Sequence, residues 1–121
     1  MTEKEFYEKI GGDYGEASSR LVKDSLIRKF VLKFKTDPNY MGLCDAIGSG
    51  DFDKAFEFSH TLKGVALNLA FKRLSAATVI LTDALRPERR SSLDPAAAVQ
   101  MLDAVSDEYK LVISSLDEIE N

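Results

Sequence analysis

Apolar residues recur every three to four positions along most of the chain, which is the spacing of amphipathic helices. Phe6 and Ile10 predict a short first helix. A long second helix is expected over residues 18–35, because apolar side chains continue at helical spacing as far as Phe34. The pattern then predicts four further helices, over residues 39–47, 51–71, 72–86 and from Asp94 onward.

Proline, glycine and aspartate residues stand at the boundaries of these segments. Pro38 is well placed to start the 39–47 helix, and either Asp51 or Asp53 can cap the helix that follows. Strand-like alternation is almost absent, and short loops join several of the helices, which favours an up-and-down bundle. The predicted fold is all-α: a four-helix bundle over about residues 18–120, with one or two short accessory helices, in a single domain of residues 1–121.

The last two predicted helices each have an apolar face that should point into this bundle. In the 72–86 helix the expected inward positions are Leu74, Ala77, Leu81 and Leu85. In the final helix they are Val99, Leu102, Val105, Tyr109, Val112 or Ile113, and Leu116.

Composition narrows the class of protein without naming it. The 121 residues are 45% hydrophobic and 30% charged, as in an ordinary globular domain, and the net charge of −4 gives no general attraction to nucleic acid or anionic lipid. No apolar run approaches the roughly 20 residues of a membrane helix, and the charged start Met1–Glu5 does not resemble a secretory signal. One cysteine, Cys44, is expected to be a small core residue, and with one histidine it cannot form a usual zinc site. We expect a cytoplasmic monomer.

The informative segment is residues 55–69, in which one helical face is apolar. At about 100° per residue that buried face gathers Ala55, Phe58, Leu62, Val65, Ala66 and Leu69. His60 falls on the opposite, outward face. Its helical neighbours there are Phe56, Glu57, Lys63, Gly64 and Leu67.

These neighbours suit phosphoryl chemistry on an exposed imidazole. A solvent-facing histidine is substantially neutral near neutral pH, so one ring nitrogen can act as a nucleophile. Lys63, one turn away, can reach phosphoryl oxygens as a mobile positive charge. Gly64 costs about 0.5–1 kcal/mol relative to alanine inside a helix, and it would clear space beside the ring. Phe56 and Leu67 are apolar on an outward face, so they either dock a partner or fold over the bundle rim.

The run His60-Thr61-Leu62-Lys63-Gly64, continuing through Ala66, Asn68 and Leu69, closely resembles the signature of histidine-containing phosphotransfer (HPt) domains of two-component signalling. The resemblance implies that His60 accepts a phosphoryl group from the aspartate of a receiver domain and passes it to another receiver. It implies partners that are response-regulator receivers or a hybrid histidine kinase. No cofactor or metal is expected in this chain, and any Mg²⁺ should lie in the partner receiver.

One residue departs from the family pattern, and one stripe of the next helix adds to the site. Family members often have glycine where this chain has Ala70, so we expect an altered exit from the histidine helix. Ser75, Val79, Thr82 and Arg86 form a stripe of the following helix, and Thr82 and Arg86 are candidates to lie near the histidine. The predicted docking residues are Phe56, Glu57, Leu67, Thr82 and Arg86.

Three other interpretations of the sequence stay open. A kinase or phosphatase is disfavoured, because the chain has no glycine-rich phosphate loop and no carboxylate cluster for magnesium. A bundle that binds partners without being phosphorylated would leave His60 unlabelled. A histidine domain of a chemotaxis kinase, phosphorylated directly from ATP, would share much of this signature.

Overall fold

The computed structural model describes residues 1–21 and 24–120. Its elements are α1 (Glu3–Ile10), α2 (Tyr14–Leu21), α3 (Asp24–Lys33), α4 (Asn39–Gly48), α5 (Phe52–Asn68), α6 (Lys72–Ala84) and α7 (Pro95–Glu120), with 3₁₀ helices η1 (Phe34–Thr36) and η2 (Pro87–Ser92). None of the helices within the described ranges is long and apolar enough to cross a membrane. The prediction of an all-α bundle is confirmed.

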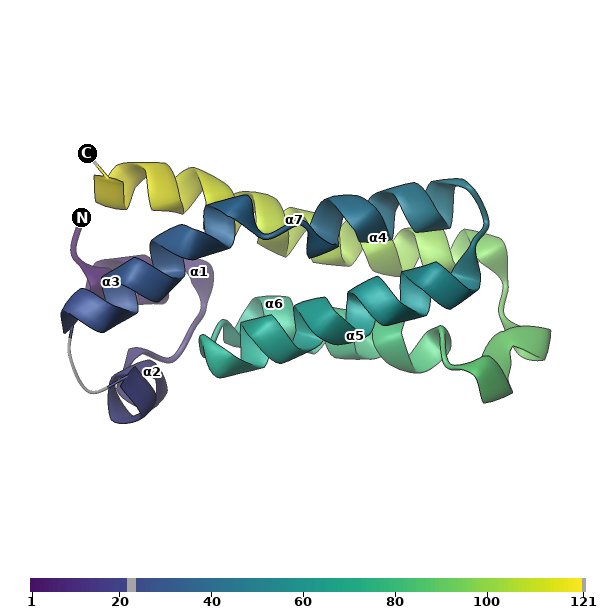
Figure 1. The fold of residues 1–121 in the computed structure, drawn as a ribbon, viewed down its shortest axis with the longest axis horizontal. Helices are drawn as coiled ribbons and strands as arrows, with labels where there is room; N and C mark the ends of the chain where they lie inside the picture. The colour runs from purple at the N-terminus through teal and green to yellow at the C-terminus, as the bar shows by residue number, and fades with distance from the viewer. Residues whose placement is uncertain (22–23, 121) are drawn as a thin grey trace.

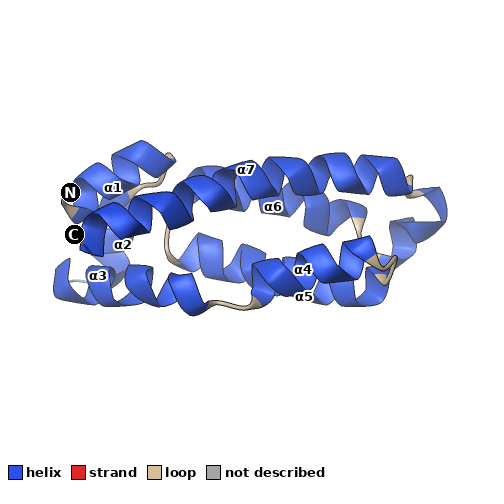
Figure 2. Cartoon of the chain, turned by 90° about the horizontal axis from the view of Figure 1, so that it is seen from above, coloured by secondary structure: helices blue, strands red, loops and turns tan. Residues whose placement is uncertain are grey.

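The bundle consists of α4, α5, α6 and α7. Consecutive helices pack against each other, and α4 also contacts α7, which closes the bundle. The longest helix, α7, runs the length of the molecule, and α1, α2 and α3 gather at the end where both termini lie (Figure 1). The view from above in Figure 2 shows the same arrangement, with α1–α3 beside the C-terminal part of α7. We call α1–α3 the N-terminal cap.

The single long helix predicted over residues 18–35 is wrong. The structure has α2 and α3 as separate helices, followed by η1, and residues 22–23 between them lie outside the described residues. α2 also starts earlier than expected, because the Asp13 carboxylate accepts the Glu16 backbone N–H at 2.9 Å. Gly15 therefore lies inside a helix instead of marking a break. The N-terminal part thus contains more short helices than predicted.

An aromatic cluster joins the N-terminal cap to the bundle. Its centre is Phe71, the residue just before α6, which is fully buried. Its ring lies 5.8 Å from that of Phe6, 5.7 Å from Tyr7 and 5.5 Å from Phe34, measured between centroids. Tilted and edge-on contacts of this kind add to the energy of burying the rings. The cap therefore shares one apolar core with the bundle helices.

Several predicted details are confirmed and others need correction. Asp51 caps α5 by accepting the Lys54 N–H at 3.1 Å, and Asp94 caps α7 by accepting the Ala96 N–H at 3.0 Å. Val99 is 48% exposed, because the buried stripe of α7 runs through Ala98, Val105, Val112, Leu116 and Ile119. Ala77 and Cys44 are half-buried and pack against the core from its edge.

Candidate functional site

Helix α5 presents His60 to solvent on the face opposite its buried stripe. The buried residues of α5 and its C-terminal turn are Ala55, Ser59, Leu62, Ala66 and Leu69. Phe58 and Val65, predicted to be buried, are half-buried. Phe58 packs beside Gly42 of α4, and Val65 lines a groove with Phe34. These two residues lie where α5 meets α4 and the segment that joins α3 to α4, and not at the centre of the bundle.

Sequence reasoning missed the burial of Ser59, although a signal was available. Ser59 is fully buried beside His60, and its helical neighbours Ala55, Leu62 and Ala66, at i−4, i+3 and i+7, were all predicted to be buried. Its polar side chain kept it out of the predicted core. The helical geometry places it on the side of α5 that faces α6.

The His60 ring is stacked and free of hydrogen bonds. The Phe56 ring lies 5.9 Å from it between centroids, with 23° between the two planes. His60 is exposed, and within the described part of the chain it makes no hydrogen bond or ion pair, so neither ring nitrogen is bonded to another described residue. Phe56 is half-buried and packs against the core. Of the two alternatives considered for it, the structure shows the packing over the bundle rim, and the Phe56 ring in addition supports one face of the imidazole.

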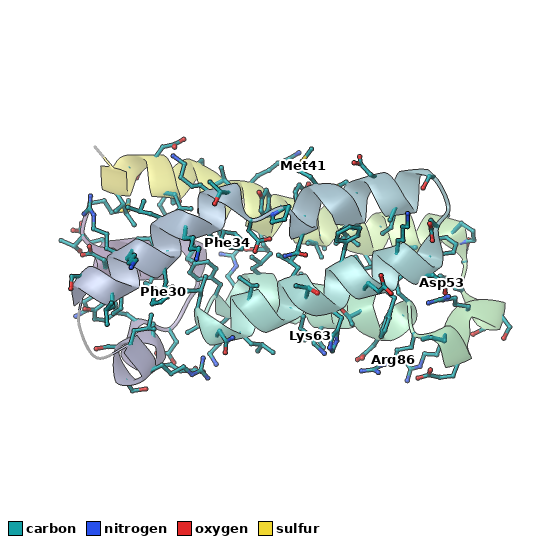
Figure 3. The ribbon with its side chains drawn as sticks, in the orientation of Figure 1. Phe30, Phe34, Met41, Asp53, Lys63 and Arg86 are labelled. Atoms are coloured by element: carbon teal, nitrogen blue, oxygen red, sulfur yellow. The ribbon has the colours of Figure 1, made fainter. Side chains whose placement is uncertain are left out.

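Lys63 and Gly64 lie beside His60 with little around them. The Lys63 ammonium forms no ion pair with any residue that the structure describes, and Figure 3 shows this side chain on the edge of α5 away from α4 and α7. A Cβ atom built on Gly64 would meet nothing within 4 Å. Gly64 is therefore not required for helix packing. The free charge and the open space are both within one helical turn of His60.

Thr82 does not lie on the surface, so the prediction that it contacts a docked partner is contradicted by its position. It is fully buried, and its hydroxyl lies 2.5 Å from the Ser59 hydroxyl. The Thr82 hydroxyl donates its proton to the Thr78 carbonyl oxygen at 2.7 Å. Ser59 must then donate to Thr82, since each hydroxyl has one proton. This chain of hydrogen bonds joins α5 to α6 directly behind His60.

The other predicted docking residues are accessible. Glu57 is exposed, and Leu67 is 42% exposed on the same helical face as His60. Arg86 is half-buried, and its Nε donates to Asp83 Oδ1 at 3.1 Å, so its charge is partly balanced. Figure 3 shows Arg86 and Lys63 along the same edge of the α5–α6 pair.

Ala70 gives α5 the type of ending that glycine usually provides. Its φ angle is +58°, in the left-handed region. The Ala70 N–H bonds to the Leu67 oxygen at 3.1 Å, and the Phe71 N–H bonds to the Ala66 oxygen at 2.9 Å, which together form a Schellman motif. The expected altered exit is therefore not seen. Alanine takes the glycine conformation, at a cost of about 1–2 kcal/mol.

Residues that could hold a metal are not grouped in this fold. Across residues 1–21 and 24–120 there is no set of three or more histidine, cysteine, aspartate or glutamate side chains placed to bind a metal ion.

Helix α5 of this four-helix bundle thus presents an exposed histidine that forms no hydrogen bond with any described residue. The model of the Hpt domain family matches residues 39–117, well over half of the chain, and the chain belongs to this family. Hpt domains are phosphocarrier modules that serve phosphotransfer in two-component signalling. Searches of curated proteins and of solved structures found no match.

Proposed function

We propose that this protein relays a phosphoryl group between receiver-domain aspartates in a multistep phosphorelay, with His60 as the acceptor. The observation that carries the proposal is the surroundings of His60. Its ring is exposed and stacks on Phe56, and among the described residues it has no hydrogen-bond partner. It lies beside Lys63, which pairs with no described residue, and beside the open space at Gly64. An exposed nucleophile with room for a partner serves transfer between two proteins.

The transfer step needs only the imidazole and the phosphorylated partner. A lone pair of a neutral ring nitrogen attacks the phosphorus atom of the aspartyl phosphate. A nitrogen–phosphorus bond forms, the bond from phosphorus to the carboxyl oxygen breaks, and the aspartate leaves as a carboxylate. The other ring nitrogen keeps its proton. Attack by a carboxylate of the second receiver reverses these changes and frees the ring.

Residues around the ring have separate roles in this proposal. Lys63 neutralises charge on the phosphoryl oxygens, and Gly64 leaves space for the phosphoryl group and the partner. Phe56, Glu57, Leu67 and Arg86 contact the docked receiver. Any Mg²⁺ required for transfer belongs to the acidic pocket of that receiver. The phosphoryl groups of these relays originate from ATP in the cytoplasm, so a cytoplasmic monomer fits such a role.

Replacement of the acceptor tests the proposal. His60 is the only histidine, so His60→Gln should abolish acid-labile labelling by ³²P-phosphorylated receiver domains. Glutamine keeps helix propensity and a polar surface, so the circular dichroism spectrum should not change. Lys54→Gln, at an exposed position of α5 outside the proposed docking face, serves as the control and should still be labelled at His60.

Two outcomes would contradict the relay. Label that persists on the His60→Gln protein would show that another residue is the acceptor. A parental protein that accepts no label from any receiver in a panel, yet binds one of them, would instead be an interaction module. A histidine kinase with ATP is included as a separate donor, and labelling by the kinase alone would identify a domain phosphorylated directly from ATP.

A further inference from the structure

The C-terminal end of the histidine helix is held by the N-terminal cap. The last carbonyl groups of any helix lack partners within that helix. Here Arg20 Nη1 donates to the oxygens of Leu67 and Asn68, at 2.5 and 3.3 Å. The Tyr7 hydroxyl donates to Leu69 at 2.7 Å, and the Asp13 N–H donates to Ala70 at 2.9 Å. Four consecutive carbonyl groups are thus bonded by a segment 47 to 62 residues away in sequence.

Arg20 is itself fixed at both of its terminal nitrogens. While Nη1 bonds the end of α5, Nη2 contacts the Glu16 carboxylate at 2.5 Å, one turn earlier in α2. The other oxygen of Glu16 pairs with Lys72, the first residue of α6. Arg20 therefore connects α2 to the end of α5, and Glu16 extends this connection to the start of α6. A guanidinium also suits this place because a helix C-terminus carries partial negative charge.

The need for this support follows from Ala70. A left-handed alanine makes the Schellman ending of α5 less favourable than a glycine would. The hydrogen bonds from the cap oppose that cost and keep the last turn formed. The Tyr7 hydroxyl is protonated and can donate at physiological pH, and burial raises its pKa further above that range.

Arg20 acts at a residue of the proposed docking face. Leu67 offers its carbonyl oxygen to Arg20, and its exposed side chain lies two turns after His60 on the same face of α5. If the last turn frays, Leu67 loses its fixed position, whereas His60, two turns inside the helix, keeps its own. The cap also lies outside residues 39–117, which the family model matches. This contact is therefore a feature of this chain beyond the matched region.

We infer that Arg20 is a positioning residue for phosphotransfer: it holds the last turn of α5 so that Leu67 stays in place to receive the partner. The inference rests on the proposed function. Arg20 does not touch the reacting atoms. Its loss should therefore slow transfer from a docked receiver without changing the reactivity of the imidazole.

Three variants and two phosphoryl donors test this role. Arg20→Ala removes the contact, and Arg20→Ala combined with Ala70→Gly removes it while relieving the left-handed alanine. Arg28→Ala is the matched control, because Arg28 also belongs to the cap and donates to a carbonyl at a helix end, at 2.8 Å from the Ile119 oxygen of α7. The donors are phosphoramidate, a small molecule that needs no docking surface, and a phosphorylated receiver domain that labels the parental protein.

We expect Arg20→Ala to slow transfer from the receiver by about 3- to 10-fold, because it removes a partly exposed, charge-assisted contact with the end of α5. Labelling by phosphoramidate should keep the parental rate. Amide exchange at Ala70 and Phe71 should become at least about tenfold faster, because fraying opens their hydrogen bonds. Adding Ala70→Gly should restore much of the receiver rate. Arg28→Ala should leave both rates and these two amides unchanged.

Other outcomes would overturn the inference. Transfer at the parental rate despite faster exchange would show that the last turn does not position the partner. Equal slowing with both donors would place the effect on His60 itself. Unchanged exchange at Ala70 and Phe71 would show that Arg20 does not hold the turn. If neither phosphoramidate nor any receiver domain of a panel labels the parental protein, the proposed function fails and the role of Arg20 in transfer fails with it.

Discussion

At the scale of single residues, two helical glycines of the bundle have opposite surroundings. A Cβ atom on Gly42 would come within 2.5 Å of Phe58 Cε1, so this glycine allows α4 and α5 to approach each other. A Cβ atom on Gly64 would meet nothing within 4 Å. The same residue type therefore serves close packing at one position and leaves open surface at the other, beside His60.

This difference gives a test of the role of Gly64. Gly64→Gln should stabilise the fold by about 0.5–1 kcal/mol, because a good helix former replaces glycine where nothing obstructs the side chain. A melting curve should move upward by about 2–5 °C. The same side chain should block a partner that approaches His60, so transfer from a receiver should fall at least about tenfold.

Gly48→Gln is the matched control for Gly64→Gln. Gly48 is the last residue of α4 and also has open space around its Cα, but it lies outside the docking face. Gly48→Gln should leave transfer at the parental rate. A Gly64→Gln protein that transfers normally, or that melts several degrees lower, would contradict the clearance role.

The residues around His60 could be predicted from sequence because they depend on a single helix. Once α5 is recognised as a helix, its 3.6 residues per turn place Lys63, Gly64 and Leu67 on the same face as His60. Which residues of other helices contact α5 could not be predicted in this way. That Thr82 is buried follows from the rotation of α6 against α5, which depends on side chains of both helices. The stripe through Ser75 and Thr82 was predicted to lie beside the buried face of α6, whereas the structure buries both of these side chains.

At the scale of helix pairs, the Ser59–Thr82 contact fixes α6 behind the histidine helix. Thr82→Val should destabilise the fold by about 1–3 kcal/mol, because the buried Ser59 hydroxyl loses its acceptor. Ser59→Ala should cost less, since Thr82 still donates to Thr78. The double variant should lose less stability than the two single losses added together, because it contains neither hydroxyl and therefore leaves none unpaired.

Chemical denaturation of the four proteins measures this coupling. Thr61→Val, whose hydroxyl bonds the Glu57 oxygen at the exposed surface of α5, controls for the general effect of removing a hydroxyl from this helix. It should change the free energy of unfolding by less than about 0.5 kcal/mol. Strictly additive losses for Ser59 and Thr82 would mean that the two hydroxyl groups do not support each other.

At the scale of the whole molecule, the N-terminal cap is the part that sequence patterns predicted least well. Its helices are short, and their contacts are distant in sequence: the Tyr7 hydroxyl reaches Leu69, and Lys9 of α1 pairs with Glu118 of α7. Periodicity detects which face of a helix is apolar, but it does not show which other helix covers that face. The packing of the bundle helices was easier to predict, because short loops place consecutive helices side by side.

The position of Phe71 predicts that the cap is needed for stability. Residues 39–117 match the family model, yet Phe71 within that range is fully buried against Phe6, Tyr7 and Phe34. A protein that begins at residue 39 would expose this ring and the carbonyl groups of Leu69 and Ala70. Uncovering one such core aromatic costs about 3–5 kcal/mol, a large part of the 5–15 kcal/mol that stabilises an ordinary domain.

Thermal melting of three shortened proteins, beginning at residues 13, 24 and 39, measures the contribution of each part of the cap. Removing α1 should cause a large loss, because it takes away the buried side chains of Phe6, Tyr7 and Ile10. Removing α2 as well should cost less, since Ala17 is its only described residue that is buried, and the further loss should include the contact of Arg20. The protein that begins at residue 39 should lose its cooperative transition. If it melts within a few degrees of the full chain, the cap contributes little to the bundle, and the aromatic cluster around Phe71 is not what holds this end of the molecule together.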